Sequence, residues 1–189
     1  MMKPGDIIGF SGASLTSDFI NVVTAGVPRW SLSHVGIIGE YRRELLLFES
    51  TTLSDLPCVI QKHKCQGVQA VRLKDRLENY QGRAWHYPLY RELYDDERLR
   101  LKAFLRSIIG RPYDSREAKE SGGLCGLLTW MASKLRVRHS SAYFCVEGTA
   151  EAYARFGIWP TDDPAKWNPN RWIRALRKRE ILLQPERLT

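Results

Sequence analysis

The chain has 189 residues, of which 43% are hydrophobic and 26% are charged, and its formal net charge is +8. This composition is typical of a globular domain with one core, and it excludes a disordered or low-complexity chain. No apolar run approaches the roughly 18 residues that a membrane-spanning helix needs, which excludes an integral membrane protein of that kind.

The first predicted element is a strand over residues 5–10. Its apolar run is too short for the core of a signal peptide, and no small-residue cleavage site follows it. We therefore expect a cytoplasmic protein, with export by a route without a cleaved signal left open. Apolar residues at helical spacing predict a helix over 17–25, and strands are predicted over 34–41 and 44–50. Two more strand-like runs cover 67–73 and 83–89.

The second half of the chain is predicted to be mainly helical. An amphipathic helix over 95–109 ends at Gly110, and its expected apolar face consists of Leu99, Leu101, Phe104, Leu105, Ile108 and Ile109. Residues 110–114 form a predicted turn, and further helices are predicted over 124–135, from Cys145 to about Phe156 with Gly157 as its end, and over 169–176. A closing strand is expected over 181–183. These elements predict one α+β domain.

Cys145 stands in Tyr-Phe-Cys-Val-Glu, at the start of a predicted amphipathic helix. Unpaired N–H groups and the positive end of the helix dipole gather there, so the thiolate form is favoured. A nucleophilic cysteine also needs a histidine base, which can come from anywhere in the chain. His34, at the start of a predicted strand, is the candidate. The alternative is that Cys145 is a small buried hydrophobic residue.

The predicted hairpin places a carboxylate beside His34. If residues 42–43 form the turn, His34 and Gly36 share a face with Glu49 and Thr51. Glu49 is then the diagonal neighbour of His34, with Cβ atoms about 7 Å apart, and Gly36 leaves it room. A carboxylate there would orient the imidazole as a base. Thr51 is the weaker candidate for that role, and a plain surface charge is the alternative interpretation of Glu49.

Five short motifs occur in a characteristic order: Gly-Asp-Ile-Ile (5–8), Ser-His-Val-Gly-Ile-Ile (33–38), Phe-Glu-Ser (48–50), Gly-Arg-Pro-Tyr-Asp (110–114) and Tyr-Phe-Cys-Val-Glu (143–147). They resemble the circularly permuted papain-like cysteine amidases. This is the permuted branch of the NlpC-type cell-wall hydrolases, distantly akin to lecithin:retinol acyltransferase-like enzymes. The resemblance covers about residues 4–158.

The resemblance implies a permuted papain-like fold, in which an antiparallel sheet or partial barrel packs against helices. It implies a catalytic set that falls on Cys145, His34 and Glu49. Val146 departs from the serine that often follows the cysteine in such proteins.

These observations predict a thiol hydrolase that cleaves amide bonds through a thioester and needs no cofactor or metal. Peptidoglycan peptides and N-acyl groups are the leading substrates, and an acyltransferase of the same fold acting on lipids is the alternative. The backbone N–H of Cys145 is the expected oxyanion donor. Tyr113 and Tyr143 are candidate substrate-binding residues, either as a second donor or as pocket wall, and ordinary packing is the alternative for both.

Two further interpretations belong to other classes of protein. From about residue 158 the chain is expected to form a basic extension, with Arg171, Arg174, Arg177, Lys178 and Arg179 close together. Such a patch fits an anionic surface or nucleic acid, and so a binding module with an inactive papain-like core, or it is a solvated helix face. Cys58, His63 and Cys65 offer three zinc ligands, but no Cys-x-x-Cys pair and no evident fourth ligand accompany them.

Overall fold

The computed structural model describes residues 1–12, 32–51, 54–112, 145–159 and 167–189. Its elements in chain order are β1 (Ile7–Gly12), β2 (His34–Tyr41), β3 (Glu44–Thr51), β4 (Gly67–Val71), α2 (Leu73–Glu78), β5 (Gly82–Tyr87), α3 (Asp95–Ile108), α6 (Cys145–Arg155), α7 (Pro169–Lys178) and β6 (Glu186–Arg187). The α+β class expected from the sequence is confirmed. The helices expected over 17–25 and 124–135 lie outside the described residues.

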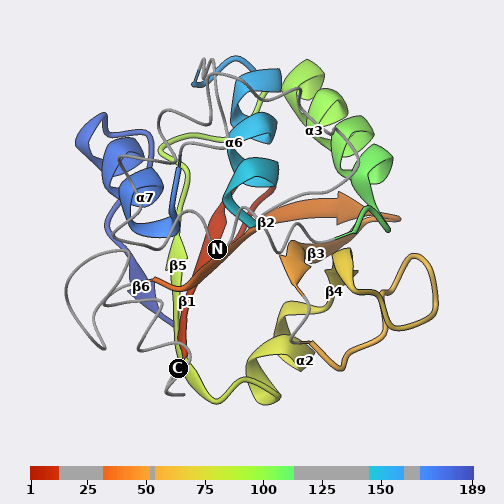
Figure 1. Cartoon of the computed structure of the whole chain (residues 1–189). Helices are drawn as coiled ribbons and strands as arrows, with labels where there is room; N and C mark the ends of the chain where they lie inside the picture. Colours follow the sequence, from red (N-terminus) through yellow and green to blue (C-terminus); the bar gives the residue numbers. More distant parts are fainter. Residues whose placement is uncertain (13–31, 52–53, 113–144, 160–166) are drawn as a thin grey trace, which may run out of the picture.

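The strands form one sheet of six in the order β4-β3-β2-β1-β5-β6, and every neighbouring pair is antiparallel. Of the two expected arrangements, an open sheet is the one present, with β4 and β6 at its edges (Figure 1). Because β1 pairs with both β2 and β5, the N-terminal strand lies inside the sheet.

The β2–β3 hairpin has the predicted register. Tyr41 pairs with Glu44 next to the turn, and the ladder continues to Ile37 and Phe48. Arg42 and Arg43 have φ angles of 50° and 66°, as a two-residue type I′ turn requires. Both residues are arginine at positions where glycine or asparagine is usual, so the strand pairing on either side, and not the turn residues, determines this turn.

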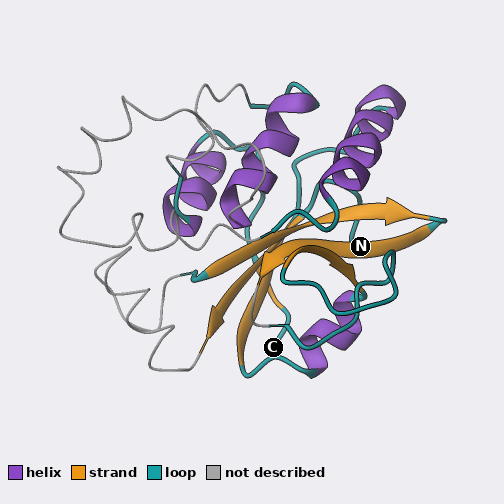
Figure 2. Cartoon of the chain, turned by 45° about the vertical axis from the view of Figure 1, so that its right-hand side comes forward, coloured by secondary structure: helices purple, strands orange, loops and turns teal. Residues whose placement is uncertain are grey.

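The sheet separates two layers. One face carries Ile7, Val35, Ile37, Leu46, Phe48, Val68 and Ala70, which pack with residues of α3, α6 and α7. The opposite face carries Ile8, Phe10, Ile38, Leu47, Val71 and Ala84, which pack with Leu73, Leu77 and Tyr80 in and after α2. Figures 1 and 2 show the three longer helices on one side of the sheet and α2 on the other.

Helix α2 was not predicted, because residues 67–73 were expected to be one continuous strand. Strand β4 instead ends at Val71, and the helix begins two residues later. Leu73, Arg76, Leu77 and Tyr80 follow the i, i+3, i+4, i+7 spacing of an amphipathic helix, and this pattern could have revealed it. Six residues are too few to form a stable isolated helix, so packing against the sheet accounts for α2.

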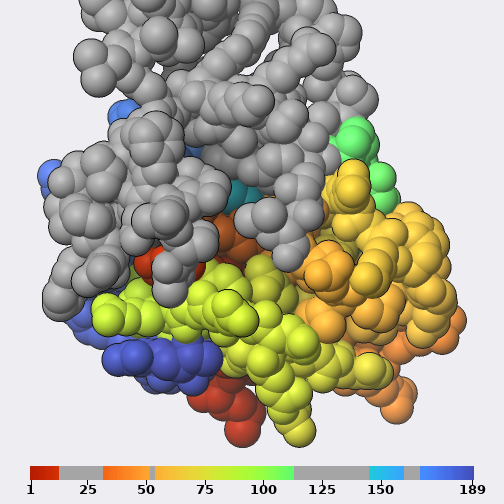
Figure 3. All heavy atoms as spheres, turned by 60° about the horizontal axis from the view of Figure 1, so that its bottom comes forward, coloured from red at the N-terminus to blue at the C-terminus, as the bar shows by residue number. Residues whose placement is uncertain are grey.

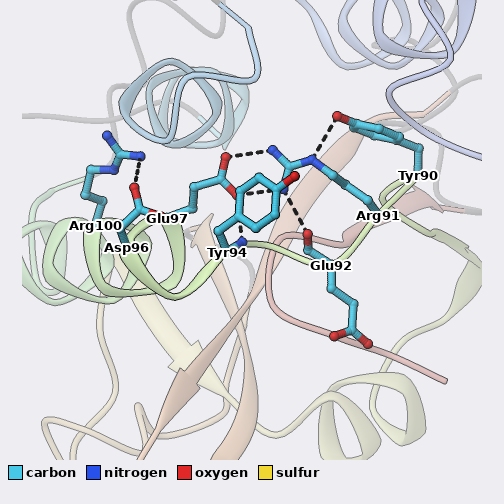
Figure 4. Close-up of polar contacts among 7 residues, drawn as sticks. All are labelled: Tyr90, Arg91, Glu92, Tyr94, Asp96, Glu97 and Arg100. Atoms are coloured by element: carbon cyan, nitrogen blue, oxygen red, sulfur yellow. Dashed lines mark hydrogen bonds and ion pairs between the residues drawn. The ribbon is translucent and has the colours of Figure 1, made fainter.

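A side-chain cluster before the first turn of α3 holds the start of that helix (Figure 4). The Arg91 guanidinium donates to both carboxylate oxygens of Glu97, at 2.6 and 2.7 Å, and lies over the Tyr94 ring at 4.4 Å. Glu97 also accepts the Tyr94 backbone N–H at 2.8 Å. One part of the helix prediction is wrong: Leu99, expected on the apolar face, is 67% exposed, because two residues at 3.6 per turn place it on the opposite side of the helix from the buried Leu101.

The C-terminal segment is part of the core. In α7, Trp172, Ile173 and Leu176 are buried, whereas its arginines are exposed. Trp172 makes edge contacts with Tyr153 of α6 and with Trp159 and Trp167. Helix α6 ends as predicted, with Gly157 at a φ of 78°. The Gly157 N–H donates to the Ala154 carbonyl and the Ile158 N–H donates to the Tyr153 carbonyl, as at a typical glycine-terminated helix end.

The prediction of a strand over 181–183 is wrong in its position. Leu182 makes a single bridge to Leu89, and the strand β6 forms later, at Glu186–Arg187, against β5. Figure 3 shows these last residues, in blue, lying against the yellow-green segment that contains β5. None of the helices in the described ranges has the length and apolar character to cross a bilayer.

Candidate active site

His34 and Glu49 are in contact at the end of the β2–β3 ladder. His34 Nε2 lies 2.8 Å from Glu49 Oε2. The Glu49 side chain is fully shielded from solvent and that of His34 is 16% exposed. A Cβ at Gly36 would lie only 3.3 Å from the Glu49 Cβ. The glycine therefore leaves room for the Glu49 side chain beside His34. The contact expected between these two residues is therefore present.

The second carboxylate oxygen of Glu49 has its own donors. Oε1 accepts a hydrogen bond from Arg76 Nε at 2.9 Å and one from Gln69 Nε2 at 3.0 Å. Burial acts to raise the pKa of Glu49 and is the largest influence. It is outweighed by His34, Arg76 and Gln69, which together lower that pKa from 4.5 to about 2. Glu49 is therefore ionised throughout the neutral range.

Cys145 is the first residue of α6, and its side chain is buried. Because Glu49 engages Nε2 of His34, the other ring nitrogen, Nδ1, is the one left for the thiol. Burial acts to lower the pKa of His34 and is the largest influence. Hydrogen bonds with Cys145 and Glu49, and the charges of both, outweigh it and raise that pKa from 6.5 to about 9. Geometry and charge thus both favour imidazolium next to Cys145.

The site joins the two layers of the fold. Glu49 and Gln69 lie on the α2 side of the sheet, in the same alternation as Leu47 and Val71. Cys145 belongs to the core on the opposite side. His34, the first residue of β2, connects the two at the end of the sheet.

Aromatic rings enclose the polar side of the site. Phe10 lies 5.6 Å from the His34 ring, measured between ring centroids. The Arg76 guanidinium lies over Phe10 and Tyr80, at 5.1 and 5.0 Å. Burial is the main reason that the pKa of Tyr80 is raised to about 12, so Tyr80 stays neutral beside these charged groups.

Two contacts between distant segments position the reacting residues. The Asn170 side chain in α7 accepts the N–H of Leu32 at 2.7 Å and donates to its carbonyl at 2.9 Å. Leu32 lies two residues before His34, so α7 anchors the chain where it enters β2. The Tyr153 hydroxyl in α6 donates to the Gly5 carbonyl at 2.7 Å, which ties the helix that carries Cys145 to the start of β1.

Sequence reasoning found His34, Glu49 and Cys145 but missed Arg76, Gln69 and Asn170. The helical spacing of α2 was the available signal for Arg76. No local sequence pattern indicated Gln69 or Asn170, because their hydrogen-bond partners are 20 and 138 residues away in the chain. Thr51, the weaker candidate partner of His34, is buried in β3 and pairs with Gly67 of β4. Tyr113 and Tyr143 lie outside the described residues.

The cysteines of the 58–65 loop do not form a zinc site. Cys65 Sγ donates to Gln61 Oε1 at 2.8 Å and lies 3.9 Å from His63 Nδ1. Burial, and then the neighbouring Cys58 thiol, raise the pKa of Cys65, which disfavours the thiolate that zinc would require. Across the part of the chain that the structure describes, no group of three or more His, Cys, Asp and Glu side chains could hold a metal ion.

Comparison with known proteins gives a likeness of fold. No family model matches the chain, and no curated protein matches it. Among solved structures, it is similar to metalloprotein yiiX from Escherichia coli O157:H7 (DUF1105), with a TM-score of 0.55 and 14% identity. The match covers 99% of this chain and 96% of that one. It therefore includes the C-terminal segment that packs into the core.

Proposed function

We propose that this chain is a cysteine hydrolase of amide or acyl bonds, with a circularly permuted papain-like arrangement. Cys145 is the nucleophile, His34 the base and Glu49 the residue that orients the base. The observation that carries the proposal is the His34 imidazole, which has a buried carboxylate at 2.8 Å on one side and the Cys145 thiol on the other. A buried cysteine with only a structural role needs neither partner.

The reaction that this geometry supports is acyl transfer through a thioester. Sγ of Cys145 attacks the carbonyl carbon after its proton has passed to His34. His34 then protonates the leaving nitrogen or oxygen, and water, deprotonated by His34, releases the acid. Glu49 stays ionised throughout and stabilises the imidazolium. The backbone N–H of Cys145, at the start of α6, is the proposed oxyanion donor.

Peptidoglycan peptides and N-acyl groups remain the proposed substrates, and an acyl-accepting lipid or amine would make the same site an acyltransferase. A metal-dependent role, suggested by the description of the yiiX structure, has weaker support. In the described part of the chain both oxygens of Glu49 and one nitrogen of His34 are already occupied by hydrogen bonds. We therefore assign no step to a metal.

The first test measures thiol reactivity. After brief treatment with iodoacetamide at about pH 6, well below the free thiol pKa of about 8.5, peptide mass spectrometry should find the label on Cys145. Buried Cys58 and Cys65 serve as internal controls. Labelling of Cys145 should be lost in His34→Ala. Equal labelling of the cysteines would contradict the proposal and favour a binding module with an inactive core.

The second test looks for the thioester. Incubation with an activated acyl ester should add one acyl group to the intact protein, and Cys145→Ala should abolish the adduct whereas Cys58→Ala should not. Adding an amine or a lipid alcohol during turnover then separates hydrolysis, which yields only free acid, from acyl transfer. Absence of an adduct and of turnover across N-acyl, peptidoglycan-peptide and lipid substrates would overturn the proposed function.

A further inference from the structure

The ion pair between Glu49 and Arg76 is buried and lies against aromatic rings. Arg76 is only 8% exposed at its side chain and Glu49 is fully buried. The Arg76 guanidinium lies over two aromatic rings, Phe10 and Tyr80, which also contact each other. Phe10 also contacts His34, so Arg76, Glu49 and His34 share one enclosed environment.

The two oxygens of Glu49 are divided between separate partners. Oε2 faces only His34 among the contacts described, whereas Oε1 receives Arg76 and Gln69. Gln69 is fully buried, and its own Oε1 has no hydrogen-bond partner in the structure as described. The one hydrogen bond described for the Gln69 side chain is therefore its donation to Glu49. This arrangement fixes the rotation of the carboxylate.

We propose that Arg76 is a positioning residue of this site, which acts through Glu49 and provides the counter-charge that lets His34 release its proton while Glu49 stays ionised. The charge count explains this role. With neutral His34, Glu49 and Arg76 form a balanced pair. Without Arg76, the loss of the His34 proton would leave a lone buried carboxylate, which is strongly unfavourable. The proton would then stay on His34.

The inference rests on the proposed function for its biological meaning, but its test does not require activity. Among the residues that the structure describes, the charged or titratable groups around His34 and its partner Glu49 are Cys145 from α6, Arg76 from α2 and Tyr80 after α2. Tyr80 is neutral over the range to be measured. Arg72 offers a matched control, since its Nε donates to Glu44 at 2.7 Å, but both side chains are largely exposed.

The experiment is an NMR titration of the histidine Cε1–H signals, with the His34 signal assigned by its disappearance in His34→Ala. Arg76→Met should move the His34 titration upward by about one pH unit, the low end of the effect of a nearby buried charge. Glu49→Gln should move it downward, although it breaks the same ion pair. Arg72→Met should leave it unchanged.

The opposite directions separate this role from simple loosening of the site. If Arg76 were merely structural, its loss would weaken the Glu49 contact and move the His34 titration downward, as Glu49→Gln does. A downward shift or no shift in folded Arg76→Met would therefore overturn the inference. If Arg76→Met does not fold, Arg76→Gln keeps a donor to Glu49 without the charge, and the same upward shift is expected. If the His34 titration moves upward in Arg76→Met but Cys145 is unreactive, the result contradicts the proposed function and leaves the role of Arg76 intact.

Discussion

His34 is the residue on which the site depends, because it contacts both Glu49 and Cys145. The raised pKa of His34 and the lowered pKa of Glu49 share one cause, the close contact of these two opposite charges, to which Cys145 adds for His34 and Arg76 and Gln69 add for Glu49. Burial opposes charge on both groups, and the pair stays ionised because the two partners and these neighbours together outweigh it.

We predict that Glu49→Gln folds and turns over on the order of 10²-fold more slowly. Gln preserves the volume but removes the charge that stabilises imidazolium, and the comparable loss in serine-protease triads is about 10⁴-fold. A smaller loss is expected because a thiolate–imidazolium pair is already partly formed in the resting state. Steady-state kinetics and the pH dependence of Cys145 alkylation measure the effect. If neither changes, Glu49 is a bystander, and Thr51 becomes the residue to test.

Among the secondary-structure elements, the β2–β3 hairpin determines the position of the site. Its register places Glu49 beside His34, and a slip by one residue would turn Glu49 to the opposite face of the sheet. The turn itself contributes little, because Arg42 and Arg43 both have positive φ. The strands on either side, buried on both faces, impose the register instead.

We predict that Arg43→Gly stabilises the protein by about 0.5–1 kcal/mol. Relief of a left-handed backbone contributes roughly 1–2 kcal/mol, and the greater freedom of glycine in the unfolded chain offsets about 0.4–1 kcal/mol of this. Urea unfolding measures the difference. Arg106→Gly, at an exposed arginine within α3, is the matched control and should destabilise by about 1 kcal/mol. Destabilisation by both substitutions would mean that the turn, and not the strands, holds the register.

For the whole molecule, the paired charges make stability depend on pH. The folded pKa of His34, about 9, exceeds its ordinary 6.5, so its contribution is complete below 6.5 and is lost as pH rises through 9. The folded pKa of Glu49, about 2, is below its ordinary 4.5, so its contribution is complete above 4.5 and is lost as pH falls through 2. Both contributions are complete only between these ordinary values.

We therefore predict that the stability of the wild type, relative to the double variant His34→Gln/Glu49→Gln, is greatest between about pH 4.5 and 6.5 and declines on both sides. Urea unfolding of both proteins at about pH 3, 5.5 and 9 gives the comparison. A difference that does not vary with pH would show that the two groups have the same pKa values in the folded and unfolded chain.

The C-terminal helix combines a buried apolar face with an exposed basic one, and these faces should have separate roles. We predict that Arg174→Glu/Arg177→Glu leaves turnover of a small neutral amide unchanged, because both arginines are exposed on α7 and neither contacts the site. Binding to anionic vesicles measures the proposed surface and should fall. Asn170→Ala, on the same helix, should lower turnover because Asn170 holds Leu32 near His34. Slower turnover of the neutral amide after charge reversal would refute this separation.

Local pattern was sufficient for the elements whose signal is contained in neighbouring residues. Apolar runs on either side of a two-residue turn predicted β2 and β3 to within one residue, together with their pairing. Helical spacing with a glycine after the last turn gave α3 and α6. Because side-chain direction alternates regularly along a strand, the register alone predicted that Glu49 reaches His34.

Tertiary structure decided the rest, because the contacts concerned join residues that no local pattern relates. Packing against the sheet turned residues 73–78 into α2, although the preceding strand pattern extended through Leu73. Helix α2 places Arg76 next to Glu49, and the pairing of β3 with β4 places Gln69 next to the same carboxylate. The basic C-terminal segment looked like an extension because its charges dominate its composition. Its buried face, with Trp172 inaccessible to solvent, became apparent only when α7 met α6, since burial depends on a partner surface that the sequence of the helix does not contain.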